Sequence, residues 1–326
     1  MAVAPHAAAL RDLAATVEVV AAYAPTEARR AAFAAAWGFP VVDRLEDALT
    51  GPGLDAVLIL TPPNTHLDLV RAAAAAGKHV LLEKPLEISL ARAKALVAAC
   101  AEAGVTLGIV LQHRFRPAAE RLRALLEEGT LGPIHGASAT IRLWRPQSYY
   151  DEPGRGTLAR DGGGVLLTQG IHTLDLLLSL AGPVAQVAGF SATLSHRMEA
   201  EDTACAALRF ANGALGAIDA TTAAFPGFPE RIDLACALGS ARLEGTGLSV
   251  QWRDGRRLDL APEAGPGGTG ADPMAFSHAA HRALIADFVA AIRAGRPPRA
   301  AGAAALQVQR LIEAIRSSGG SAVDLP

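Results

Sequence analysis

The first third of the chain alternates short apolar runs with stretches that have helical spacing. Runs rich in branched residues at 16–24, 55–61, 79–84 and 105–111 predict strands, and the segments between them predict helices. The run at 55–61 is almost entirely apolar, which is typical of a parallel strand that is covered on both faces. This alternation predicts βαβ units and a doubly wound parallel sheet.

Glycine and polar residues mark where the predicted helices begin and end. Gly38 follows a helix over 26–37, and Asn64 is expected to cap a later helix. The chain opens on a predicted helix at 5–13, although a doubly wound nucleotide-binding domain normally opens on a strand and a glycine-rich turn. A natural start upstream of Met1 is the favoured explanation, and a reorganised sheet is the alternative.

Beyond residue 136 the period changes to strict alternation. Alternate side chains over 136–143 are apolar, and three turn-forming pairs separate the strand-like runs that follow. Because such pairs supply the backbone conformations of tight hairpins, they predict an antiparallel sheet that can leave one face open. The pairs are Asn212-Gly213, Gly239-Ser240 and Asp254-Gly255, and two helices with apolar stripes at 284–292 and 311–315 close the chain.

The change of period predicts two domains. The first, over 1–115, is a dinucleotide-binding domain, and the second, over 116–326, binds substrate or mediates oligomerisation, with the last helices able to pack back on the first domain. The pattern G-x-G-x-x-G occurs at Gly265, Gly267 and Gly270. It follows prolines rather than a strand, so it is interpreted as a surface loop.

Composition excludes several classes of protein. Of 326 residues, 51% are hydrophobic and 19% are charged, which excludes a disordered chain, and the formal net charge of −2 offers no footprint for nucleic acid or anionic lipid. No apolar run is long enough to span a membrane. Cys100, Cys205 and Cys236 are interpreted as small buried hydrophobes in a reducing compartment, which predicts a cytoplasmic enzyme. His278 and His281 lack a third ligand, so no metal site is predicted.

Two loops at the ends of predicted strands carry candidate chemistry. In open α/β sheets, ligands bind beyond the carboxyl ends of the strands. The segments 61–66 (TPPNTH) and 83–85 (EKP) both lie there, and Lys84 is suited to act as an acid or an electrostatic clamp. The alternative interpretations are a capped helix start and a solvated lysine.

A glycine-rich segment at 162–175 (GGGVLLTQGIHTLD) carries the third candidate. On a continuous helix, Thr168, His172 and Asp175 share one face. A histidine there can exchange protons near neutral pH. A buried, hydrogen-bonded core histidine is the alternative interpretation.

Together these motifs resemble the Gfo/Idh/MocA family of NAD(P)-dependent oxidoreductases. The resemblance rests on TPPNTH at 61–66, EKP at 83–85, QHRF at 112–115 and the stretch from Arg155 to Asp175, in that order. It implies an α/β fold: a Rossmann-like domain, here without its first strand, and an α/β domain with an open, mostly antiparallel sheet that often mediates oligomerisation.

The resemblance also implies roles for single residues. Lys84 would lie between nicotinamide and substrate, and His172 would act on the substrate hydroxyl. The residues implied to bind the cofactor are Thr61, Pro62, Asn64, His66, Glu83, Lys84, Pro85, Gln112 and Arg114, and weaker substrate-side candidates are Thr168, Arg155, Tyr149 and Tyr150.

Three departures from the family pattern affect these expectations. The glycine-rich turn is absent together with the first strand. Many members carry an aspartate where this chain has Thr168, which cannot hold a negative charge. The acidic residue usual after the second strand would be Ala24, with Arg29 and Arg30 nearby, so NADP is slightly favoured over NAD.

The resulting hypothesis is an NAD(P)-dependent dehydrogenase. It would transfer a hydride between the cofactor and a secondary alcohol or ketone of a sugar, cyclitol or related polyol, and it would form a homo-oligomer, either a dimer or a tetramer. The alternative is a non-catalytic binding or partner subunit with the same fold and an incomplete cofactor site.

Overall fold

The computed structural model describes residues 3–51, 53–263 and 277–325. They divide into two compact units: the first is Met1–Glu87, Ala91–Val110 and Ser277–Ala303, and the second is Ile88–Leu90, Leu111–Phe276 and Ala304–Pro326. The G-x-G-x-x-G match at 265–270 lies outside the described residues. Over the described ranges, none of the helices combines the length and the apolar character that a membrane crossing requires.

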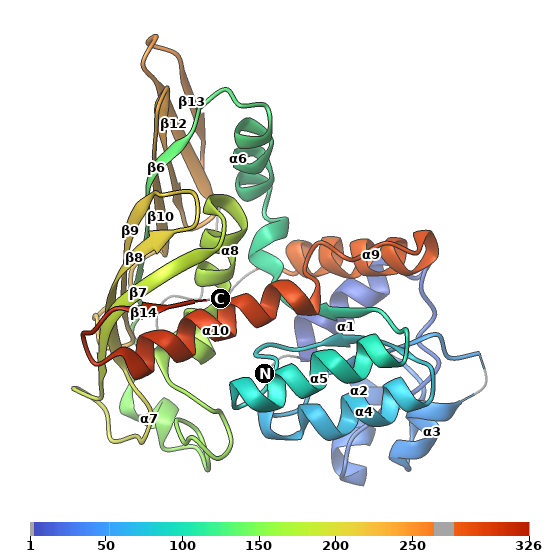
Figure 1. The fold of residues 1–326 in the computed structure, drawn as a ribbon. Helices are drawn as coiled ribbons and strands as arrows, with labels where there is room; N and C mark the ends of the chain where they lie inside the picture. Colours follow the sequence, from blue (N-terminus) through green and yellow to red (C-terminus); the bar gives the residue numbers. More distant parts are fainter. Residues whose placement is uncertain (1–2, 52, 264–276, 326) are drawn as a thin grey trace. The chain divides into compact units, whose positions relative to one another are not determined.

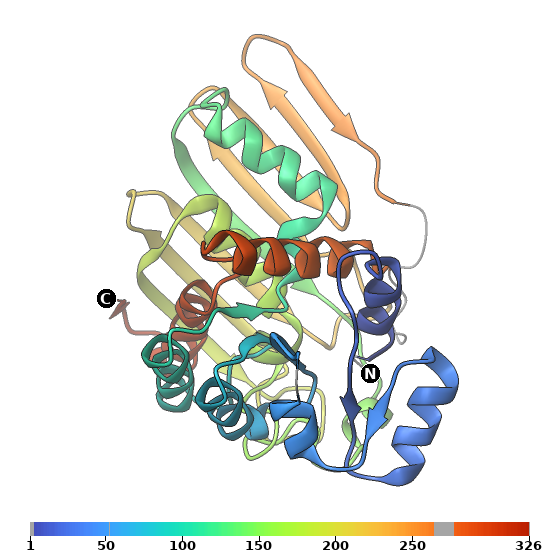
Figure 2. The same cartoon turned by 90° about the vertical axis from the view of Figure 1, so that its right-hand side faces the viewer.

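A parallel sheet forms the centre of the first unit, as predicted. Its strands are β3 (Ala56–Ile59), β4 (His79–Leu82) and β5 (Leu107–Ile109), with β4 in the middle. Figure 2 shows α9 (Ala279–Ala294) on one face of this sheet and α4 (His66–Ala75) on the other. Burial on both faces explains why these strands read as continuous apolar runs.

Helix α9 comes very close to the sheet at β5. A Cβ added to Gly108 would lie 2.8 Å from a ring carbon of Phe288, so only glycine permits this approach. On the same unit, α1 (Val3–Asp12) packs beside α9, and the His278 ring lies 2.9 Å from a carboxylate oxygen of Asp12. Segments from both ends of the chain therefore complete the first unit.

The strand predicted over 16–24 is much shorter than expected. Only β1 (Ala22–Tyr23) forms, and it pairs in parallel with β2 (Val41–Val42) in a separate two-stranded sheet. Among the described residues β1 has a ladder partner on one side only, which leaves little to extend it. Helix α1 is the first described element, in agreement with the predicted helix at 5–13.

Helix ends follow the sequence signals in one case and not in another. The Thr26 hydroxyl accepts the backbone N–H of Arg29 at the start of α2 (Glu27–Trp37), and Gly38 ends that helix with φ of 72°. The prediction that Asn64 caps a helix is wrong. Asn64 lies inside a 3-10 turn (η1, Pro63–Thr65), which forms because prolines stiffen the loop and the Thr65 hydroxyl bonds back to the Pro62 carbonyl.

The second unit is built on one large, mostly antiparallel sheet. Among the described residues its strands lie in the order β13-β12-β11-β10-β6-β9-β8-β7-β14, and the β6–β9 pair is parallel. Their bounds are β6 Ile134–Arg142, β7 Val184–Ala192, β8 Thr203–Phe210, β9 Leu215–Thr221, β10 Arg231–Cys236, β11 Gly239–Glu244, β12 Gly247–Trp252, β13 Arg257–Leu260 and β14 Val323–Asp324.

Two of the three predicted hairpin turns are confirmed. Asn212-Gly213 joins β8 to β9 and Asp254-Gly255 joins β12 to β13, with φ of 88° at Gly213 and 92° at Gly255. The prediction for Gly239-Ser240 is wrong, because these residues begin β11. A Cβ on Gly239 would lie 2.5 Å from the Gln251 carbonyl oxygen, so this glycine serves close strand approach rather than a turn.

One face of this sheet is covered and the other is open. Figure 1 shows α6 (Pro117–Glu127), α8 (Ile171–Ala181) and α10 (Gly302–Ser318) on the covered face. Ala137, Ala139 and Ile141 point into this core, as their alternation predicted. Cys205 is exposed on the open face, so its interpretation as a buried hydrophobe is wrong, whereas Cys100 and Cys236 are buried.

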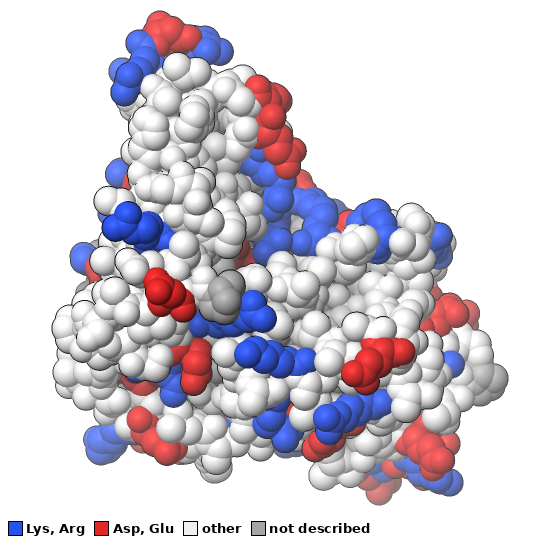
Figure 3. All heavy atoms as spheres, in the orientation of Figure 1, with Lys and Arg blue, Asp and Glu red and all other residues white. Residues whose placement is uncertain are grey.

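Figure 3 shows acidic and basic side chains interspersed over the face in view, in keeping with a formal net charge of −2. On the open sheet face, Arg142 pairs with Asp219 and Arg242 pairs with Asp233 across neighbouring strands. Such exposed pairs contribute about 0–1 kcal/mol each to stability.

Candidate functional site

The loops that follow β3 and β4 are fastened to each other inside the first unit. The His66 side chain is fully buried, with Nε2 2.9 Å from the Thr61 carbonyl oxygen and Nδ1 3.0 Å from the Pro85 carbonyl oxygen. The hydroxyls of Thr65 and Thr61 are hydrogen-bonded at 2.7 Å. The structure therefore brings together Thr61, Pro85 and His66, and the buried histidine side chain joins the two loops.

Lys84 stands at the carboxyl end of the central strand, partly exposed. Its backbone N–H donates to Oε2 of Glu83 at 3.0 Å. It is one of three lysines, so 27 of the 30 basic residues are arginines. In a chain that uses arginine almost throughout, the scarcity of lysine is a further signal for Lys84, beside the motif and the strand end. An ammonium is a compact point charge, which suits contact with a single oxygen atom.

Glu83 is a buried carboxylate held in its ionised form. Its Oε1 lies 2.9 Å from Nε2 of His6, from helix α1. Burial alone would raise the pKa of Glu83, but the His6 hydrogen bond and the charges of His6, Lys84 and His281 outweigh burial and lower it. The sequence motif gave no sign that the first helix reaches this glutamate.

Gln112 opens the short turn η2 (Gln112–Phe115) in the second unit. Its side-chain oxygen is buried and has no hydrogen-bond donor among the described residues. A buried amide oxygen without a donor costs about 1–3 kcal/mol. This acceptor therefore fits a donor supplied by a bound molecule, such as the carboxamide of a nicotinamide.

The segment that carries His172 is not one continuous α-helix. A π-helical turn (η3, Val165–Gln169) precedes α8, so the prediction that Thr168 and His172 share a regular helical face is corrected. The reason lies at Gly164, where a Cβ would be 1.6 Å from the Glu201 carbonyl oxygen and the backbone is pressed against that residue. The Thr168 hydroxyl donates to the Gly164 carbonyl at 2.7 Å.

His172 is supported by a stacked ring and lies one turn from a buried ion pair. Its ring stacks on His113 with centroids 4.8 Å apart and planes at 29°. Arg114, next to His113, donates from Nε and Nη2 to the two carboxylate oxygens of Asp175, each at 2.6 Å. The pair fastens η2 to α8 inside the second unit. The Arg114 guanidinium is buried in this pair, and its contact with a ligand stays a prediction.

The two predicted tyrosines occupy different surroundings. The Arg155 guanidinium lies over the Tyr149 ring at 4.0 Å, and Arg145 lies 5.8 Å from the same ring. The Gln169 amide donates to the Tyr149 hydroxyl at 3.5 Å. Tyr150 instead points into the core and its hydroxyl donates to that of Thr222, and burial raises the pKa of Tyr150 to about 12.

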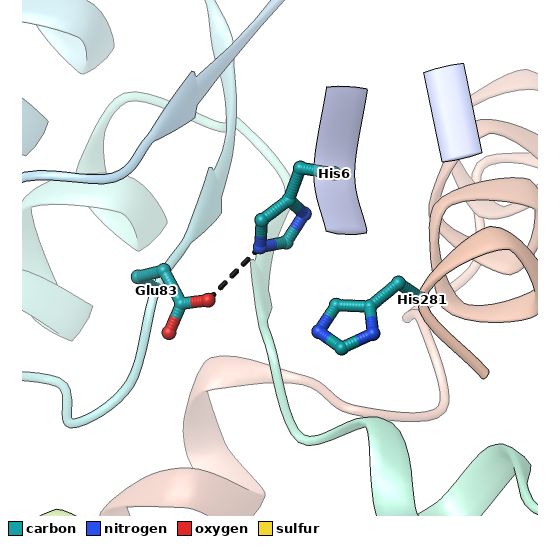
Figure 4. Close-up of side chains that lie close together, drawn as sticks. All are labelled: His6, Glu83 and His281. Carbon is teal, nitrogen blue, oxygen red and sulfur yellow. Dashed lines mark hydrogen bonds and ion pairs between the residues drawn. The ribbon is translucent and has the colours of Figure 1, made fainter. Parts of the chain in front are cut away.

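Among the residues that the structure describes, one cluster has the composition of a metal site. The ligand atoms of His6, Glu83 and His281 lie within 4.8 Å of one another, and all three side chains are buried (Figure 4). Sequence spacing gives His281 no further ligand, because its two neighbours in this cluster come from distant parts of the chain. His278, by contrast, bonds to Asp12 at the surface.

Comparison with known proteins places this architecture in a family. Residues 1–110 match the oxidoreductase family with an NAD-binding Rossmann fold, and residues 119–242 match the GFO/IDH/MocA C-terminal domain. The chain belongs to the GFO/IDH/MocA family. The resemblance inferred from its motifs and the predicted fold class are therefore confirmed.

Three relatives illustrate the kinship. D-apiose dehydrogenase of Paraburkholderia graminis is 30% identical over 95% of this chain and 82% of its own length. Myo-inositol 2-dehydrogenase of Thermotoga maritima is 33% identical over 58% of this chain, and the match spans 56% of that enzyme. The WlbA dehydrogenase of Bordetella pertussis, solved with NADH and UDP-GlcNAcA, is 31% identical with a TM-score of 0.83, covering 98% of this chain and 94% of that chain.

These relatives agree on a class of chemistry. Two are dehydrogenases of D-apiose and of myo-inositol, and the third is a dehydrogenase solved with NADH and UDP-GlcNAcA. They support NAD(H)-linked oxidoreduction of a sugar or polyol for this GFO/IDH/MocA protein.

Proposed function

We propose that this protein oxidises a secondary alcohol of a sugar, cyclitol or related polyol, or reduces the corresponding ketone, with NAD(P). The observation that carries the proposal is the position of Lys84. The central strand of the parallel sheet delivers this lysine to the edge where ligands bind in open α/β sheets, beside an ionised glutamate.

Two side chains carry the proposed chemistry. His172 takes the proton of the reacting hydroxyl while the hydrogen on the same carbon leaves with its electron pair, so that a carbonyl forms. Lys84 orients the hydroxyl and stabilises the negative charge that develops on its oxygen. The bound nicotinamide supplies the acceptor or donor of the hydride.

The remaining predicted residues serve binding in this proposal. Gln112 is the most specific of them, because its buried amide oxygen accepts no hydrogen bond among the described residues. Tyr149, flanked by Arg155, is proposed to line the substrate side. The cofactor side comprises Thr61, Pro62, Asn64, His66, Glu83, Pro85, Gln112 and Arg114, and the weaker substrate-side set adds Thr168 and Tyr150.

NADP is proposed as an acceptable cofactor beside NAD. After β1 the chain carries Ala24 rather than a carboxylate that would bind the ribose hydroxyls and repel a 2′-phosphate. The Arg30 guanidinium donates to the Ala24 carbonyl at 2.8 Å, which places a positive charge there. The variant A24D should shift the ratio of NADPH to NADH affinity toward NADH by about tenfold or more.

Homo-oligomerisation through the open sheet face is also proposed. Small side chains such as Ser138, Ala217 and Ala235 allow close approach, and the charges on this face are paired within it. Light scattering should give a dimer or tetramer, and a large residue at Ala217 (A217W) should shift it toward monomer. A monomeric wild type would contradict this part of the proposal. We also propose a cytoplasmic location, testable by cell fractionation.

The test of the activity is a substrate panel. The purified chain is incubated with D-apiose, myo-inositol or UDP-GlcNAcA and with NAD⁺ or NADP⁺, and reduced cofactor is measured. We expect turnover with at least one sugar or polyol, and H172A should lower it by about 10²–10⁴-fold with unchanged NADH affinity. A folded protein that binds neither NADH nor NADPH would instead support a non-catalytic partner subunit.

A further inference from the structure

The side chain of Glu83 links the proposed catalytic lysine to the first helix of the chain. One carboxylate oxygen accepts the backbone N–H of Lys84 at 3.0 Å, and the other lies 2.9 Å from Nε2 of His6. Glu83 and His6 are 77 positions apart and both are buried. A carboxylate bonded at both oxygens has one orientation, so the peptide between Glu83 and Lys84 is fixed as well.

A second helix supports His6. The His281 ring, from α9, packs against the His6 ring in a T-shaped arrangement, with centroids 4.9 Å apart and planes at 89° (Figure 4). His6 is 1% exposed and His281 is 3% exposed. Two helices from opposite ends of the first unit's sequence therefore converge on one glutamate.

The surroundings of His6 favour a hydrogen bond to Glu83 over a cation bound between the two side chains. A histidine that binds a metal almost always donates its other ring N–H to an acceptor. Nδ1 of His6 is buried and has no hydrogen-bond partner among the described residues. The described residues supply no such acceptor at Nδ1, whereas Nε2 lies within direct hydrogen-bond distance of Glu83, at 2.9 Å.

We propose that His6 is a positioning residue: through the Glu83 carboxylate it fixes the location and the electrostatic surroundings of Lys84, and His281 holds its ring in place. The inference rests on the proposed function of Lys84 for its purpose, but the geometry that it describes can be tested without turnover. The consequence is that loss of the His6 donor changes the state of Lys84 and not merely the packing of helix α1.

The test uses the small number of lysines. With only Lys78, Lys84 and Lys94 in the chain, limited acetylation by acetic anhydride followed by peptide mass spectrometry resolves each side chain. Lys94 is exposed and serves as the internal reference. The ratio of Lys84 to Lys94 labelling is measured across a pH series for the wild type and for H6L, H6Q and E83Q.

We expect E83Q to raise the labelling ratio by about threefold at a pH below the usual lysine pKa, because it removes the negative charge beside Lys84 and so increases the free-amine fraction of that lysine. H6L keeps this charge but removes its hydrogen-bond donor, which leaves the charge less compensated and favours the ammonium form, so we expect the ratio to fall. H6Q retains an N–H donor and should restore a ratio close to that of the wild type. The matched control is H278A: His278 also joins α9 to α1, but at the surface and through Asp12. Its ratio should equal that of the wild type.

Three outcomes would overturn the proposal. One is an unchanged ratio in H6L and E83Q proteins that remain folded, and another is an equal change in H278A, which would indicate helix docking alone. The third is a stoichiometric divalent ion in the wild type that H6L lacks. If the labelling changes as expected while K84M keeps full turnover, the positioning pair stands and the proposed function of Lys84 fails.

Discussion

The two units each bury an ionised carboxylate, but they do so with partners from very different distances along the chain. Asp202 in the second unit accepts the backbone N–H groups of Leu194, Ser195 and His196, which are six to eight positions away. Glu83 in the first unit depends on His6, 77 positions away. The Asp202 carboxylate, bonded to residues nearby in sequence, closes a turn. The Glu83 carboxylate, bonded to a distant residue, lies beside Lys84, for which we propose a catalytic role.

The energetic causes of the two low pKa values differ accordingly. Burial opposes ionisation in both cases. At Asp202 it is outweighed by hydrogen bonds from three backbone N–H groups and from the His196 ring, and at Glu83 by the His6 hydrogen bond and nearby positive charge. Backbone donors are fixed by the turn itself, so Asp202 is a structural group, while side-chain donors make Glu83 sensitive to single substitutions.

The largest expected effect on stability is that of D202N. The substitution replaces an ionised acceptor by an amide whose NH₂ faces backbone donors, and we expect a loss of about 3–5 kcal/mol in the free energy of unfolding. Denaturant titration measures it. A loss under 1 kcal/mol would contradict a structural role for this carboxylate.

A smaller loss is expected for E83Q. The glutamine carbonyl can still accept one of the two hydrogen bonds, so the free energy of unfolding should fall by about 1–3 kcal/mol. The same titration, run beside D202N, checks the comparison directly. Equal or larger destabilisation than in D202N would mean that Glu83 is chiefly structural.

The dependence of unfolding on acid gives a further test of the Asp202 carboxylate. The pKa of Asp202 is lowered from 3.8 by folding, so its stabilisation is present above 3.8 and is lost as the pH falls through the lower folded value. As the pH falls below 3.8, the free energy of unfolding of the wild type should therefore decline more steeply than that of D202N. Parallel pH dependences in the two proteins would contradict the direction of this pKa shift.

The smallest effect is expected on the open sheet face. The exposed pair between Arg242 and Asp233 should contribute about 0–1 kcal/mol, so D233N should unfold almost like the wild type. A loss above 2 kcal/mol would show that this face is buried in an assembly.

Local sequence patterns predicted the elements well and their junctions less well. The parallel strands and the Asn212-Gly213 hairpin follow from periodicity and turn chemistry, which act over a few residues. Asn64 and Gly239 were assigned by residue type alone, and in both cases the neighbouring residues determine a different structure. The loop around Asn64 forms a 3-10 turn instead of a helix cap, and Gly239 lies in a strand against Gln251 instead of in a turn. The π-helical turn at 165–169 depends on contact with Glu201 and has no local signature.

The residues of the candidate site also fall into two groups, those that sequence motifs reveal and those that only the fold reveals. Lys84 and His172 were found from motifs, because strand ends and glycine-rich segments are visible in sequence. His6, Asp175 and Gln169 were not assigned their contacts, because each one acts through a residue that is distant in sequence or displaced by the irregular turn. Supporting residues of this kind require the fold.

The most direct test of the proposed role of Lys84 is the turnover of K84M. The wild type and K84M are compared with the sugar or polyol that the wild type oxidises, and NADH affinity is measured by fluorescence in the same samples. We expect K84M to lose turnover by about 10²–10³-fold, with NADH affinity within about threefold of the wild type. A folded K84M protein with near wild-type turnover would contradict it.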